Sequence, residues 1–178
     1  MMTFITKRIE DFFIYNTTVK YLNKNNILNL LCVFIFIACP SATNAHQYKL
    51  GNLEIIDPWT RTTAKNAKVG SGYLYIINHS DTPDQLIAIS TNRAKETEIH
   101  SMSVTNNIMQ MKKIPNGIEI PGKGEIILKP GGNHIMFIGL SKPFQHNEKI
   151  NAKLIFEKAG IIEVDFLAKT TGATFPSK

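Results

Sequence analysis

The sequence predicts an all-β fold, a β-sandwich preceded by a cleavable signal peptide. From residue 46 onward, short runs rich in Ile, Val, Leu, Tyr and Phe are separated by turn residues at near-regular intervals, which is typical of a sandwich or barrel. No long stretch shows a helical hydrophobic period, and no segment repeats. A short apolar segment near the N-terminus, followed by small residues, indicates the signal peptide.

The apolar segment, residues 27–39, is shorter than the roughly 20 residues that span a bilayer. It follows basic residues, and Thr43 and Ala45 fit the small-residue positions before a signal peptidase cut. We therefore expect residues 1–45 to be a Sec-type signal peptide with a long n-region, which directs the mature protein to the periplasm. The alternatives are a buried core helix and a lipoprotein anchored at Cys39, where a partial lipobox ends.

The remaining chain is expected to form one domain over residues 46–168 and a polar, flexible tail over residues 169–178. The only cysteines, Cys32 and Cys39, lie in the predicted leader, so the mature protein has no disulfide and no thiolate ligand. The net charge is +6, and the lysines are spread along the chain. A nucleic-acid-binding protein would instead show a basic stripe with aromatic residues.

The expected strands of this domain are separated by turns that contain Gly, Pro, Asn or Asp. Pro58 cannot donate to a central ladder, so the segment around it is expected at a sheet edge or a strand end. The last two strands are expected to form a hairpin. In chain order the strands are 53–56, 73–78, 85–89, 96–102, 108–114, 117–120, 125–128, 134–140, 150–157 and 161–167.

The methionines are the most unusual feature of the predicted domain. The chain has six, and apart from Met1 and Met2 all lie in two short segments that also contain histidines, 100–111 and 134–136. One methionine in a strand is more often core filler than a ligand. Thioethers and imidazoles concentrated together are instead typical of a soft-metal site, and they favour Cu(I).

Strand geometry groups these side chains in pairs, because residues i and i+2 lie on the same face. The turn at 130–132 places the second segment at one rim of the sandwich, and we expect the first segment on a facing strand at the same rim. Because Met109 and Met111 lie on the same face of one strand, strand alternation alone does not decide which of them faces the metal. The same-face pairs are His100 and Met102, Met109 and Met111, and His134 and Met136. His46, His79 and His146 are expected to be surface residues.

These motifs resemble the periplasmic copper chaperones of the PCuAC family, over roughly residues 46–168. In that family a His is followed, after ten intervening residues, by a Met and later by a His-x-Met motif. Here ten residues separate His100 from Met111, and twenty-two separate Met111 from His134, which is one more than usual. The resemblance extends to the segments 45–48, 57–61, 70–74, 98–102, 109–111, 117–121, 129–136 and 156–160.

The resemblance implies a cupredoxin-like Greek-key β-sandwich that binds one Cu(I) per chain. The ligands that it implies are His100, Met111, His134 and Met136. It also implies delivery of copper to the CuA site of cytochrome c oxidase subunit II, directly or with a thiol-bearing assembly protein. Met102 and Met109 are expected to line the site or to act as substitute ligands. Trp59 is expected in the core or near the site.

The sequence contains no arrangement of residues typical of an enzyme, so we expect a binding protein that is not an enzyme. The absence of cysteine from the predicted domain argues against a blue-copper electron carrier, which needs a thiolate. Two other functions remain open. One is a periplasmic copper buffer or resistance protein with the same site. The other is a metal-free β-sandwich interaction module in which the methionines are core residues.

Overall fold

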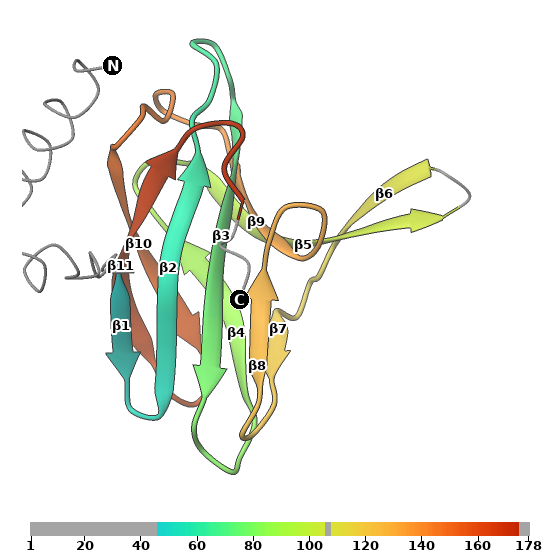
Figure 1. Cartoon of the computed structure of the whole chain (residues 1–178), viewed down its shortest axis with the longest axis vertical. Coiled ribbons are helices and arrows are strands. Elements are labelled where there is room, and N and C mark those ends of the chain that lie inside the picture. The colour runs from blue at the N-terminus through green and yellow to red at the C-terminus, as the bar shows by residue number, and fades with distance from the viewer. Residues whose placement is uncertain (1–45, 106–107, 175–178) are drawn as a thin grey trace, which may run out of the picture. The chain divides into compact units, whose positions relative to one another are not determined.

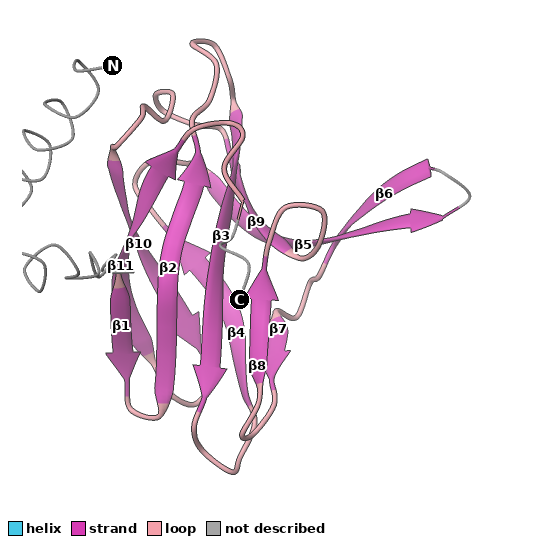
Figure 2. Cartoon of the chain, viewed as in Figure 1, coloured by secondary structure: helices cyan, strands magenta, loops and turns pink. Residues whose placement is uncertain are grey.

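Eleven β-strands form the described part of the chain, which comprises residues 46–105 and 108–174 of this computed structural model (Figures 1 and 2). None of these residues belongs to a helix that could cross a bilayer. The predicted signal peptide, with Cys39, lies outside the described residues. The strands are β1 (Gln47–Leu50), β2 (Leu53–Arg61), β3 (Val69–Asn78), β4 (Asp84–Ser90), β5 (Glu96–Thr105), β6 (Ile108–Lys113), β7 (Ile118–Ile120), β8 (Glu125–Leu128), β9 (His134–Ile138), β10 (Lys149–Phe156) and β11 (Ile161–Lys169).

The strands pair in the order β6-β5-β9-β3-β2-β11-β10-β4-β7, with β1 added to β2 and β8 added to β3. Among the described strands only β11 and β2 pair in parallel, and this pair places the last strand of the domain beside its second strand. The sheet curls, so that β2 and β3 lie in front of β10 and β4 in the view of Figure 1. This architecture confirms the all-β prediction and the expected hairpin of the last two strands.

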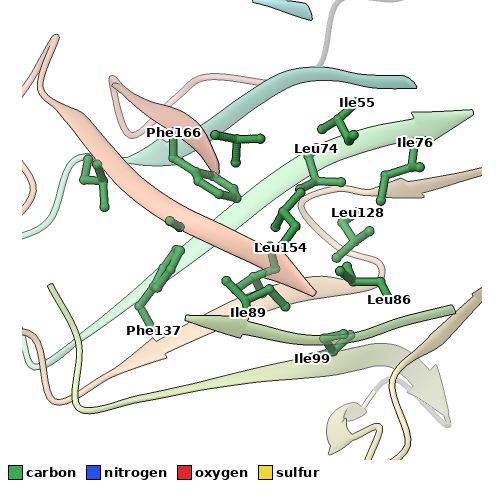
Figure 3. Packing of buried hydrophobic residues seen from close by; sticks show 14 of the residues in the cluster. Ile55, Leu74, Ile76, Leu86, Ile89, Ile99, Leu128, Phe137, Leu154 and Phe166 are labelled. Atoms are coloured by element: carbon green, nitrogen blue, oxygen red, sulfur yellow. The ribbon is translucent and has the colours of Figure 1, made fainter. Parts of the chain in front are cut away.

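The core lies between the two halves of the curled sheet, where aliphatic and aromatic side chains from both point toward one another (Figure 3). Buried and exposed residues alternate strictly along the first six positions of β10, as expected for a strand with one face against the core. Phe137 of β9 contacts Phe144 and Phe166 edge to face, at centroid distances of 5.6 and 5.8 Å. Burying each such side chain contributes about 1.5–3 kcal/mol.

Pro58 lies inside β2, between β3 and β11, so the expectation of a sheet edge or strand end is wrong. The strand accommodates it through an irregularity, because the register with β3 shifts between Ile56 and Trp59. Asp57 has a φ of 46° at this point, which takes Pro58 out of the regular ladder. Lys169 was expected to begin the flexible tail, but it is the last residue of β11. Its ammonium contacts the Asp57 carboxylate at 2.7 Å.

The hairpin formed by β5 and β6 extends away from the sandwich (Figure 1). β6 is an edge strand of the sheet, and all six of its residues are exposed. β5 continues in the other direction beside β9, where Ile99 points into the core (Figure 3). One strand therefore connects the exposed hairpin with the packed sandwich.

Candidate metal centre

Three neighbouring strands, β6, β5 and β9, carry all the residues of the predicted metal site. In the register, His100 lies opposite His134, Met102 lies opposite Met111, and Glu98 lies opposite Met136. Residues directly opposite on paired strands share a face. All these side chains therefore occupy the face that is turned away from the core. The two segments are brought together on adjacent strands of one sheet, and not on facing strands as expected.

The two histidine rings lie next to each other, with centroids 5.9 Å apart and an interplanar angle of 49°. A ring nitrogen binds a metal at about 2.0–2.1 Å, so two rings that share one ion have centroids at most about 6.4 Å apart. The observed separation lies within this limit. His134 is only 3% exposed, so its ring is shielded from water.

In each histidine, one ring nitrogen forms a hydrogen bond, and the other is the candidate metal ligand. The Nδ1 of His134 is 2.9 Å from the carbonyl oxygen of Gly132 and donates to it, so Nε2 carries the lone pair. The Nε2 of His100 is 2.7 Å from Oε2 of Glu98. Its Nδ1 is buried and has no hydrogen-bond partner among the described residues. A buried nitrogen of this kind, backed by a carboxylate on the other nitrogen, is the usual arrangement of a metal-binding histidine.

Glu98 is the residue of this site that sequence reasoning missed. Its carboxylate accepts hydrogen bonds from His100 and from the Lys113 ammonium, the latter at 2.6 Å. Lys113 and, next, His100 hold the pKa of Glu98 below its usual value, so the carboxylate is charged at neutral pH. The strand alternation that pairs His100 with Met102 also places Glu98 on the same face, and this signal was available in the sequence.

The methionines occupy the rows of the sheet on either side of the row that contains the two histidines. Met136 is half-buried and follows His134 on the same face of β9. Met111 is 47% exposed, lies opposite Met102 and is a diagonal neighbour of His100 across the β5–β6 ladder. Met109 lies opposite Val104, one row farther from the histidines. Of the two methionines on this face of β6, Met111 therefore lies nearer to the histidine pair.

The remaining candidates lie elsewhere. His46, His79 and His146 are exposed, as predicted. Trp59 is fully buried and packs against Tyr73 at a centroid distance of 4.4 Å. The described residues contain no group of three or more histidine, cysteine or carboxylate side chains placed around one point. The donors beside the histidine pair are neutral thioethers, a set that favours a soft monovalent ion.

The all-β fold of this chain is that of the PCuAC domains, which are known in apo and copper-bound structures. The chain belongs to the LpqE-like family, described as "Putative lipoprotein LpqE-like", whose model matches residues 53–168. The recognition of a PCuAC-family protein from the sequence motifs is thereby confirmed, together with the cupredoxin-like fold.

Solved structures with the same fold include the apo PCuAC domain from PmoF1, which is 29% identical. The match has a TM-score of 0.60 and covers 70% of this chain and 99% of that domain. The copper-bound PCuAC domain from PmoF2 is 24% identical, with a TM-score of 0.61, over 70% of this chain and 98% of that domain. At 24% identity, the match to the PmoF2 domain shows a shared fold and no more.

A relative with a curated sequence is the putative lipoprotein Lxx21020 of Leifsonia xyli subsp. xyli. It is 30% identical over 71 residues, which are 40% of this chain and 43% of the relative. The chain thus matches less than half the length of this relative.

Proposed function

We propose that this protein is a periplasmic Cu(I) chaperone that holds one ion between His100, Met111, His134 and Met136. The observation that carries the proposal is the histidine pair, with ring centroids 5.9 Å apart and hydrogen bonds that leave one nitrogen of each ring available. The copper-bound state of the PCuAC domain from PmoF2 supports copper as the metal. The thioethers beside the rings favour Cu(I) over Cu(II) or Zn(II).

The site suits ligand exchange. Its donors are neutral, so an ion can leave without exposing an unpaired buried charge. Met111 is half exposed and lies on the edge strand, whereas His134 is buried. A donor group from an acceptor protein can therefore replace Met111 first and the imidazoles afterwards. This order requires no catalytic step, and the protein acts as a carrier and not as an enzyme.

The proposed acceptor is the CuA site of cytochrome c oxidase subunit II, reached directly or through a thiol-bearing copper assembly protein. Export depends on residues 1–45 as a Sec-type signal peptide. The family description as a putative lipoprotein supports the alternative of a lipid anchor at Cys39. The intact mass of the mature protein distinguishes these, because cleavage after Ala45 removes Cys39 and lipidation retains it.

Competition titration with a chromogenic Cu(I) chelator tests the site. We expect one Cu(I) per wild-type chain and at least about hundredfold weaker binding by the double variant His134→Ala/Met136→Ala, because two of four ligands are lost. The matched control is His79→Ala/His146→Ala, which removes two exposed histidines and should bind like the wild type. Equal, weak binding by the wild type and the site variant would favour a metal-free interaction module.

X-ray absorption of the loaded protein tests the ligand types. We expect both nitrogen and sulfur scatterers around Cu(I), and a coordination shell without sulfur would contradict the roles of Met111 and Met136. Deletion of the gene tests delivery. Loss of oxidase copper that excess copper restores supports the chaperone, whereas normal oxidase copper with increased copper sensitivity identifies a buffer or resistance protein.

A further inference from the structure

The exposed face of the β5–β6 hairpin carries two thioethers that the four-ligand site does not use, those of Met102 and Met109. Met102 lies directly opposite Met111, and Met109 lies two residues before Met111 on the same strand. Directly opposite residues have Cβ atoms about 4.5–5.5 Å apart, and diagonal neighbours are still within reach of long side chains. The unbranched methionine side chains therefore allow the three sulfur atoms to meet around one point.

The donors on this face form a ladder with a gradient of burial. Met109 is 72% exposed, Met111 is 47% exposed and His134 is 3% exposed. Met109 and Met111 are successive same-face positions of β6, about 6.6–6.8 Å apart. His134 lies two strands farther in, on β9 beside His100 of β5. From the end of the hairpin inward, the donors thus change from exposed thioethers to the histidine pair, of which His134 is buried.

Packing does not explain the exposed methionines. Every residue of β6 is exposed, so Met109 and Met111 fill no core space. The charged side chain nearest to them on this face, Lys113, is held by Glu98 at 2.6 Å. The methionine positions are therefore neutral, accessible and rich in sulfur, and these properties suit the capture of Cu(I) from another ligand.

We propose that Met102, Met109 and Met111 form a second Cu(I) site, coordinated only by sulfur, which receives the ion before it moves to the histidine pair. The inference rests on the proposed function as a Cu(I) carrier. Met111 belongs to both sites and remains bound while Nδ1 of His100 and Nε2 of His134 replace the other two thioethers. Thioethers carry no proton, and neutral imidazoles that donate to Glu98 and Gly132 would bind through their other nitrogens, so the transfer exchanges neutral ligands and copper stays Cu(I).

Two variants of the mature protein test this site. In His100→Ala/His134→Ala, the imidazoles are gone, and we expect weaker but measurable Cu(I) binding with an X-ray absorption spectrum that contains sulfur and no imidazole nitrogen. In Met102→Leu/Met109→Leu, the apolar volume is nearly unchanged. The four ligands His100, Met111, His134 and Met136 are all retained. We expect about tenfold slower uptake from a Cu(I)–bicinchoninate complex in stopped flow, equivalent to about 1.4 kcal/mol in the barrier.

Val104→Leu/Ile108→Leu is the matched control, because it changes two exposed apolar residues of the same hairpin without changing a sulfur ligand. It should take up Cu(I) at the wild-type rate. Wild-type uptake by Met102→Leu/Met109→Leu, or no Cu(I) binding by the imidazole variant, would overturn the second site while leaving the four-ligand site intact. Failure of the wild type itself to bind Cu(I) would instead overturn the proposed function.

Discussion

Among the single residues of the metal face, Glu98 determines how His100 is presented. Its carboxylate holds the Nε2 of His100 at 2.7 Å and leaves Nδ1, which is buried, directed away from the carboxylate. Lys113 contacts the other carboxylate oxygen and restrains the whole group. Such partners on the outer side of a ligand orient the ring and increase its basicity. Glu98 is therefore a positioning residue for the proposed ligand and not a ligand itself.

Replacing Glu98 with alanine should weaken Cu(I) binding about tenfold, because partners of metal-bound histidines typically contribute 10–100-fold to affinity. Chelator competition at neutral pH measures the change, and the far-UV circular dichroism spectrum should stay that of the wild type. Glu96→Ala is the control, because Glu96 is an exposed carboxylate on the same strand. Wild-type affinity of Glu98→Ala would show that the ring is oriented by other contacts.

Among the strands, β3 connects the core with the metal face. Its Gly72 lies opposite Ile135 of β9, and the neighbouring pair joins Ser71 to Met136. The backbone at Gly72 passes directly beneath the aromatic core, because a Cβ atom there would be 2.7 Å from Cε2 of Phe137. The fit between β3 and β9 therefore depends on the missing side chain, and β9 carries half of the proposed ligands.

The variant Gly72→Ala should lower the free energy of unfolding by about 1–3 kcal/mol, because the added methyl group forces Phe137 and the adjacent Phe166 to shift. Urea unfolding followed by circular dichroism measures the loss. Gly172→Ala provides the comparison, since a Cβ at that position meets nothing within 4 Å. If both variants unfolded at the same urea concentration, the core beneath β3 would have room to accommodate the methyl group.

For the molecule as a whole, stability should depend on pH through Glu148, whose carboxylate accepts hydrogen bonds from two loops. Arg93 donates to its carboxylate at 2.6 Å, and the backbone N–H of Gln145 donates to the other oxygen at 3.0 Å. Burial alone would raise the pKa of Glu148, but the hydrogen bonds from Gln145, Arg93 and Lys142 outweigh it and lower the pKa. The carboxylate therefore stabilises the folded protein when it is charged.

The direction of the effect follows from the lowered pKa. The stabilisation is fully present above the pKa of the unfolded chain and is lost as the pH falls through the lower pKa of the folded state. At pH 7, Glu148→Gln should unfold with about 1–2 kcal/mol less free energy than the wild type, since hydrogen bonds to a charged group are lost. The difference should disappear at acidic pH. Glu163→Gln, at an exposed ion pair, should change little at either pH.

Several strands could be predicted from local patterns. The hairpin of β10 and β11 depends only on residues close in sequence, and it appears as expected. Pro58 was misassigned because proline normally marks an edge. Here a shift in register at Asp57 lets an interior strand contain it, and that irregularity depends on the pairing with β3.

Residue types and their spacing were sufficient to predict the all-β class, the copper-chaperone family and which side chains share a face, because strand alternation is a property of the local chain. Only the tertiary structure showed that His100 faces His134 on a neighbouring strand, that Met111 lies closer than Met109, and that Glu98 engages one nitrogen of the pair. These relations depend on the register between strands. That register results from packing Ile99, Ile135 and Phe137 into a core assembled from distant parts of the chain.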